Sequence, residues 1–126
     1  MINDIAKKLN ELRTEENVWI IYLFIIILSF YSNNLERKYF LFNDLESKEN
    51  YRNTMIIIFT ILVLIYSYFT INSYKSMENL AIFDSDKKVS LTSLSFIASF
   101  LILISGLIYL YIILNDENID VEIAFN

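Results

Sequence analysis

The feature that most constrains the fold of this chain is a run without charged residues over positions 89–115. As a helix rising ~1.5 Å per residue, this run would extend roughly 40 Å, which exceeds the ~30 Å hydrocarbon layer of a bilayer. Similar uncharged runs lie between Glu16 and Glu36 and between Arg52 and Lys75. The sequence therefore predicts an all-α membrane protein with three transmembrane helices.

The hydrophobic content of the chain agrees with this prediction. The 126 residues leave room for one domain, and 56% of them are hydrophobic, above the ~45–50% of ordinary soluble domains. A soluble three-helix bundle needs helices with polar outer faces, whereas segments 56–59 and 61–65 are apolar all the way round. Lipid is the medium that suits such a surface.

The residue types that are missing exclude most kinds of chemistry. The chain has no Cys, His or Pro and a single Gly, Gly106. Disulfides, thiol nucleophiles and imidazole or thiolate metal sites are therefore excluded, as is the side chain that most often acts as a general base. The uncharged runs hold no ionisable residue for a proton path, and a net charge of −5 gives no basis for binding nucleic acid. We predict no enzyme, no cofactor and no metal site.

The first sixteen residues have the pattern of an amphipathic helix. Ile2, Ile5, Leu9 and Leu12 follow one another at spacings of three or four, and charged residues occupy the rest of the turn. This apolar stripe could lie in the headgroup layer or pack on the other helices. It could also bind a partner or sense lipid.

Polarity divides this single membrane domain into seven segments. Residues 43–53 fit either a solvated loop or the solvated first turn of the next helix. The segments are an amphipathic helix (1–16), a first span (17–35), an outer loop with an interfacial segment (36–52), a second span (53–74), an inner loop (75–88), a third span (89–115) and an acidic tail (116–126).

Two aspartates at the end of the inner loop, Asp84 and Asp86, invite comparison with carboxylate pairs that hold a metal ion. With no accompanying domain, they fit better a loop that caps the third span and meets Lys87 and Lys88. The acidic tail likewise lacks the glycine and spaced ligands of a calcium-binding loop. We expect neither segment to bind a metal.

Small and hydroxyl-bearing residues are the main polar groups in the predicted spans. Ser95 and Ser99 have the small-x-x-x-small spacing that allows helices to approach closely. The face can pack within the chain, pack against another chain, or line a pore after oligomerisation. The residues predicted for it are Thr92, Ser95, Ala98, Ser99, Ser105, Gly106, Thr60 and Ser67.

Aromatic residues recur near the ends of the spans, as in the aromatic belts of membrane proteins. The motif Leu-Ile-Tyr-x-Tyr occurs at 64–68 and again at 107–111, and we interpret this as convergence on interfacial anchoring rather than as duplication. The predicted anchors are Trp19, Tyr22, Tyr31, Tyr66, Tyr68, Tyr109 and Tyr111.

Basic residues in the connections predict the orientation, because they are retained on the cytoplasmic side. Six lie before the first and third spans, namely Lys7, Lys8, Arg13, Lys75, Lys87 and Lys88, and four lie in the first connection, namely Arg37, Lys38, Lys48 and Arg52. The prediction is a multi-pass protein of the cell membrane with its N-terminus in the cytoplasm and its C-terminus outside.

These observations lead to two functional hypotheses. The first is a non-catalytic membrane protein, of bacterial origin, that acts through helix-to-helix contacts as an accessory, assembly or immunity-type subunit. Its partners would be the lipid bilayer and either itself or another membrane protein. The alternative is a homo-oligomeric pore or holin-like permeabiliser, with Thr92, Ser95, Ser99 and Ser105 lining the pathway.

Overall fold

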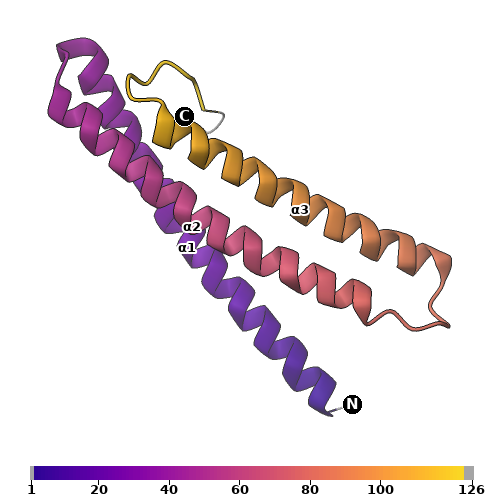
Figure 1. The fold of residues 1–126 in the computed structure, drawn as a ribbon. Coiled ribbons are helices and arrows are strands. Elements are labelled where there is room, and N and C mark those ends of the chain that lie inside the picture. The colour runs from indigo at the N-terminus through magenta and orange to yellow at the C-terminus, as the bar shows by residue number, and fades with distance from the viewer. Residues whose placement is uncertain (1, 124–126) are drawn as a thin grey trace. The chain divides into compact units, whose positions relative to one another are not determined.

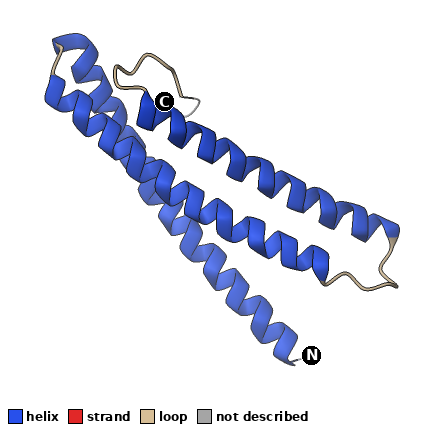
Figure 2. Ribbon diagram, viewed as in Figure 1, coloured by secondary structure: helices blue, strands red, loops and turns tan. Residues whose placement is uncertain are grey.

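The computed structural model describes residues 2–123, and within them it has three long helices and no strand. The helices are α1 (Ile2–Phe42), α2 (Leu45–Glu78) and α3 (Asp86–Asn115), joined by the short connections seen in Figure 2. Each is long and apolar enough to cross a membrane. The prediction of an all-helical chain with three such helices is therefore confirmed.

The chain forms two compact units that meet in sequence within α2. The first ends at Thr54 and contains α1 and the first residues of α2. The second begins at Met55 and contains the rest of α2, α3 and the segment that follows.

In the first unit, α1 is one continuous helix where the sequence pattern shows three segments. The expected amphipathic helix, the first span and residues 36–42 all belong to it. A helix of this length needs no break at the changes of polarity, because it contains neither Pro nor Gly. Ile2, Ile5 and Leu9 are exposed along its first turns.

The expected outer loop over 36–52 is helical except at two residues, Asn43 and Asp44. Asn43 has a positive φ of 52°, a conformation that Asn adopts more readily than most residues. Asp44 caps α2, because its carboxylate accepts hydrogen bonds from the Glu46 N–H at 3.2 Å and the Ser47 hydroxyl at 2.8 Å. Residues 45–53 are thus the first turns of the next helix, the second of the two alternatives.

In the second unit, α2 and α3 pack side by side in opposite directions (Figure 1). The ring centroids of Phe59 and Tyr109 are 5.6 Å apart, and those of Tyr74 and Phe96 are 5.7 Å apart. Phe59 comes before Tyr74 in α2, whereas its partner Tyr109 comes after Phe96 in α3. The two helices are therefore antiparallel. The pair is joined by a connection over 79–85.

The start of α3 is capped by the loop around Asp84 and Asp86, as the sequence predicts. Ser85, and not an aspartate, is the N-cap: its hydroxyl accepts the Lys88 N–H at 3.2 Å. Asp84 instead accepts a hydrogen bond from the Lys88 ammonium at 3.0 Å, which is one of the two ion pairs expected of this loop.

The segment after α3 is not helical up to Ile123, and the last three residues of the predicted tail lie outside the described part of the chain. The carboxylate of Asp116 accepts the N–H groups of Asp120 and Val121 at 3.0 and 2.8 Å. This first part of the acidic tail therefore forms a turn closed by its own aspartate.

Candidate helix-packing site

The site is built on the face that α3 presents to α2. Partly or fully buried residues recur on this face at alternating spacings of four and three, which is the repeat of a helix packed along another helix. They are Thr92, Phe96, Ser99, Leu103, Gly106 and Leu110. Phe96, Ser99 and Gly106 each contact a residue of α2.

Ser99 is the centre of a small polar network across the helix pair. Its hydroxyl donates to the Ser95 carbonyl at 3.0 Å, and the Ser73 hydroxyl lies 3.1 Å from it. Because the single proton of Ser99 is used toward Ser95, Ser73 is the donor to Ser99. The network thus runs from α2 through the Ser99 hydroxyl to the backbone of α3.

Thr70 adds a second polar contact one turn away. Its hydroxyl lies 2.7 Å from the Tyr66 carbonyl in its own helix and 3.1 Å from the Ser99 carbonyl in α3. Both oxygens are acceptors, so the one proton of Thr70 is shared between them. Every hydroxyl of this network is satisfied by protein, and none of them requires water.

Gly106 allows α3 to approach the ring of Tyr66. A Cβ at this position would lie 3.1 Å from Cδ2 of Tyr66 and 3.4 Å from Cγ2 of Val63. The first distance is shorter than ordinary van der Waals contact, so Tyr66 would have to move to admit a side chain. The lack of a side chain at Gly106 therefore lets the ring of Tyr66 lie close to the backbone of α3.

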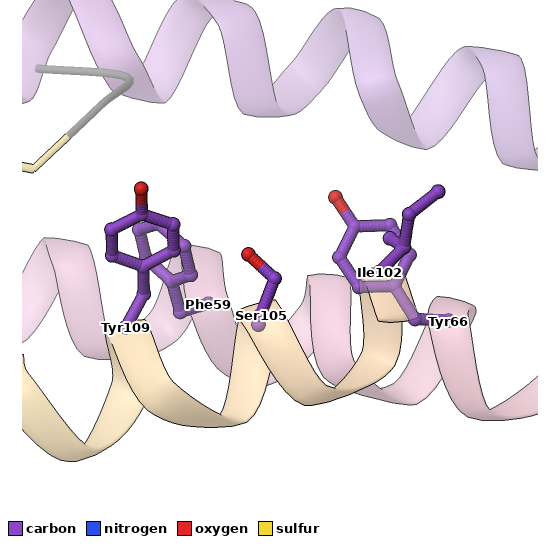
Figure 3. Close-up of a pocket in the computed structure, with 6 residues that line it drawn as sticks. Phe59, Tyr66, Ile102, Ser105 and Tyr109 are labelled. Atoms are coloured by element: carbon purple, nitrogen blue, oxygen red, sulfur yellow. The ribbon is translucent and has the colours of Figure 1, made fainter. Parts of the chain in front are cut away.

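A recess of about 240 Å³ lies beside this contact. Its lining comes from α2 and α3 and contains no charged residue: Phe59, Tyr66, Ile102, Ser105, Gly106 and Tyr109. Figure 3 shows the hydroxyl groups of Tyr66, Ser105 and Tyr109 turned to the same side of the helix pair. The recess is smaller than the roughly 300–1,000 Å³ typical of ligand pockets, and it holds no group that titrates near neutral pH.

The structure brings together some of the residues predicted for a packing face. Ser99 and Gly106 contact α2, Ser105 lines the recess, and Thr92 and Ser67 are half-buried. Thr60, Ser95 and Ala98 are exposed, although the Ser95 carbonyl takes part in the network.

Several residues of the site were not among those predicted for a packing face, and Ser73, Tyr74 and Phe96 are examples. Tyr66, Thr70 and Ser73 follow at spacings of four and three, so they share one face of α2. This spacing is visible in the sequence, but only the register against α3 shows that the face meets Ser99.

The predicted aromatic anchors have different surroundings. Trp19, Tyr31, Tyr68 and Tyr111 are exposed, and the rings of Trp19 and half-buried Tyr22 meet edge to face with centroids 5.5 Å apart. Tyr66 and Tyr109 instead contact residues of the partner helix, Gly106 and Phe59 respectively. The first tyrosine of each copy of the motif therefore lies in the helix-packing site: Tyr66 comes from α2 and Tyr109 comes from α3.

The acidic residues of the described chain lie along its length rather than in one cluster. Among the described residues there is no group of three or more acidic residues that could hold a metal ion. The described ion pair joins Asp84 in the connection to Lys88 in the first turn of α3, and both residues lie outside the uncharged runs. The arrangement as a whole defines an all-helical protein with three helices of membrane-spanning length and an α2–α3 packing site. No protein-family model, curated protein or solved structure matches this sequence.

Proposed function

We propose that this chain is a small, non-catalytic integral membrane protein that crosses the bilayer three times and works through helix-to-helix contacts as an accessory, assembly or immunity-type subunit. The observation that carries the proposal is the surface of α3. This helix has the highest hydropathy of the three, 2.6, yet only 11% of its most apolar window is buried. Such a surface is costly in water and favourable against lipid or other apolar helices.

The hydroxyl groups within the apolar helices support the same proposal. Ser29, Thr70 and Ser99 each donate to the carbonyl four residues earlier, at 2.8, 2.7 and 3.0 Å. Hydrocarbon offers no hydrogen-bond partners, so polar groups placed in it must be satisfied within the protein. These three side chains meet that condition.

The contacts of Ser99 favour packing over the pore hypothesis. A pore-lining hydroxyl must face water, whereas the Ser99 hydroxyl is engaged with Ser73 and Ser95. Of the four residues suggested for a pathway, Ser95 and Ser105 are exposed and Thr92 is half-buried. Ser99 is thus committed to the helix pair, and the proposed action is contact between helices.

Two measurements test this function. After cells are broken without detergent, the untagged protein should sediment with membranes and resist extraction at alkaline pH; a folded protein in the supernatant would refute the membrane assignment. Crosslinking in cells should then capture either a second copy or another membrane protein. A strictly monomeric protein with no crosslinked product would refute the contact role, and ion flux through reconstituted liposomes would favour the pore.

A further inference from the structure

The first helix is too long to end at the membrane surface. α1 is one continuous helix from Ile2 to Phe42, and its uncharged run begins after Glu16. At ~1.5 Å per residue, Ile2 lies roughly 21 Å along the helix axis from Glu16. A bilayer with a ~30 Å core and a total thickness of ~40–45 Å has a headgroup layer only about 5–8 Å deep on each side. Because the helix is unbroken, residues 2–10 project beyond the bilayer instead of lying along its surface.

Exposed apolar side chains form one stripe along α1, which we name the α1 seam. They follow at alternating spacings of three and four, which are positions a and d of a heptad repeat and the pattern of a helix that packs along another helix. The seam begins with Ile2, Ile5, Leu9 and Leu12 and continues at the same spacing from Trp19 to Phe30, and each of these apolar side chains is at least 40% exposed. Only Glu16, at an a position, interrupts it. The repeat thus extends over about four heptads, a length typical of helices that pair along their axes.

The buried face of α1 is a different one. The buried residues of this helix are Val18, Ile25, Ser32 and Leu35. They occupy positions c and f of the same repeat, on the side of the helix away from a and d. Lipid can cover the α1 seam inside the bilayer, but it does not reach the part of the seam that projects beyond the headgroups. Exposure of those large apolar side chains to water is unfavourable, so this part of the seam requires a protein partner.

The charges in and beside the α1 seam oppose pairing with a second copy. Two copies in one membrane would place their α1 helices parallel and at the same height. Glu16 would then face Glu16 at an a position, and Lys8 at position g would face Arg13 at position e of the other copy. Like charges that face each other across an interface disfavour that pairing. Charge complementarity therefore favours a different helix, with a basic residue opposite Glu16 and acidic residues opposite Lys8 and Arg13.

We propose that the α1 seam binds a helix of a different membrane protein, which crosses the bilayer beside α1 and continues beyond it as α1 does. The partner helix has an apolar seam of its own and carries the complementary charges. This inference rests on the proposed function, because it requires that α1 spans the membrane, and it names the surface through which the chain makes its contact.

A charge-swapped copy of the full-length chain serves as the probe for such a partner. It carries Lys8→Glu, Arg13→Glu and Glu16→Lys, so its apolar seam is unchanged and its charges complement those of the original chain. Glu11→Lys, at position c on the buried side of the repeat, keeps the number of basic residues before the first span at three. The two copies should therefore insert in the same orientation when they are expressed together.

A disulfide reports contact at the α1 seam, because the chain has no cysteine of its own. Leu9→Cys is introduced into both copies, a tag distinguishes them by size, and isolated membranes are oxidised mildly. Lys7→Cys in both copies is the matched control, because position 7 is position f, on the far side of the helix from the seam.

We expect the Leu9→Cys disulfide to form between the original and the charge-swapped copy and to weaken when added salt screens the charges. Two original copies should give far less product, and Lys7→Cys should give none. No disulfide between the original and the charge-swapped copy would overturn the inference. An equally strong disulfide between two original copies would also overturn it and make a second copy the occupant, and an equal yield from Lys7→Cys would reduce the contact to chance collision. These failures leave the proposed function standing while the chain sediments with membranes, whereas a chain in the soluble fraction would refute that function itself.

Discussion

The ring of Tyr66 in α2 lies so close to Gly106 in α3 that a Cβ at position 106 would be 3.1 Å from its Cδ2 atom, and the ring would have to move to admit one. This relationship ties the one glycine of the chain to one of its nine tyrosines. Val63, also in α2, would lie 3.4 Å from the same Cβ through its Cγ2 atom. This contact makes a specific prediction.

Gly106→Ile should destabilise the α2–α3 pair by about 1–3 kcal/mol, the usual cost of overpacking a close contact. Unfolding by added SDS in mild detergent, followed by circular dichroism, measures the change. Ala98→Ile is the matched control, because Ala98 is exposed on the same helix and should tolerate the same side chain. Adding Tyr66→Ala should restore part of the loss. Equal effects at positions 98 and 106 would show that the close approach to Tyr66 does not matter.

The polar network makes a second prediction. Thr70→Val and Ser73→Ala each remove a hydrogen bond between α2 and Ser99, and each should cost about 0.5–2 kcal/mol in an apolar medium. Ser29→Ala is the control, since the hydroxyl of Ser29 donates within its own helix, to the Ile25 carbonyl. The same SDS titration measures all three variants. A loss at Ser29 as large as at Ser73 would mean that the cross-helix bonds contribute nothing of their own.

The connection between α2 and α3 should respond to acid. The hydrogen bond from the Lys88 ammonium, together with the Ala81 N–H, lowers the pKa of Asp84 below its ordinary value of 3.8. A carboxyl with a lowered pKa contributes stability that is fully present above the unfolded value and is lost as the pH falls through the folded one. The connection at Asp84 should therefore loosen only below pH 3.8. The NMR signal of the Asp84 carboxyl carbon, recorded as a function of pH, measures this change.

Asp84→Asn should abolish this acid response. Asp44, in the connection between α1 and α2, provides the comparison. Its pKa is also lowered, and the main cause is the hydrogen bond from the Ser47 hydroxyl. Asp44→Asn should leave the transition at the α2–α3 connection unchanged. A transition near or above pH 3.8 in the unmodified protein would contradict the role of Lys88.

The fold was predictable from sequence to the extent that it depends on local hydropathy. Three uncharged runs gave three helices, because length and apolarity are properties of each segment alone. The continuity of α1 was not predicted, since the changes in polarity at Glu16 and Glu36 suggest boundaries. Polarity marks where the surroundings of a helix change, but α1 continues through both changes and ends at Phe42, where Asn43 takes a positive φ and Asp44 caps the next helix.

The helix-packing site was predictable in part for the same reason. Ser99 and Gly106 were identified because small residues allow close approach, whichever helix comes near. Their pairing with Tyr66 and Ser73 was not, because the antiparallel register of two helices depends on how both fit together. That fit cannot be predicted when each segment of a single sequence is considered separately.

The orientation provides the last prediction. The six basic residues within 7–13 and 75–88 outnumber the four within 37–52, so we expect the N-terminus and the α2–α3 connection to lie in the cytoplasm. In a chain without cysteine, a membrane-impermeant maleimide should therefore label Asn43→Cys and Glu117→Cys on intact cells. Asn79→Cys in the α2–α3 connection should react only after lysis. The opposite labelling pattern would show that the orientation is the reverse of the predicted one. Labelling of Asn43→Cys and Asn79→Cys from the same side would show that α2 does not cross the membrane.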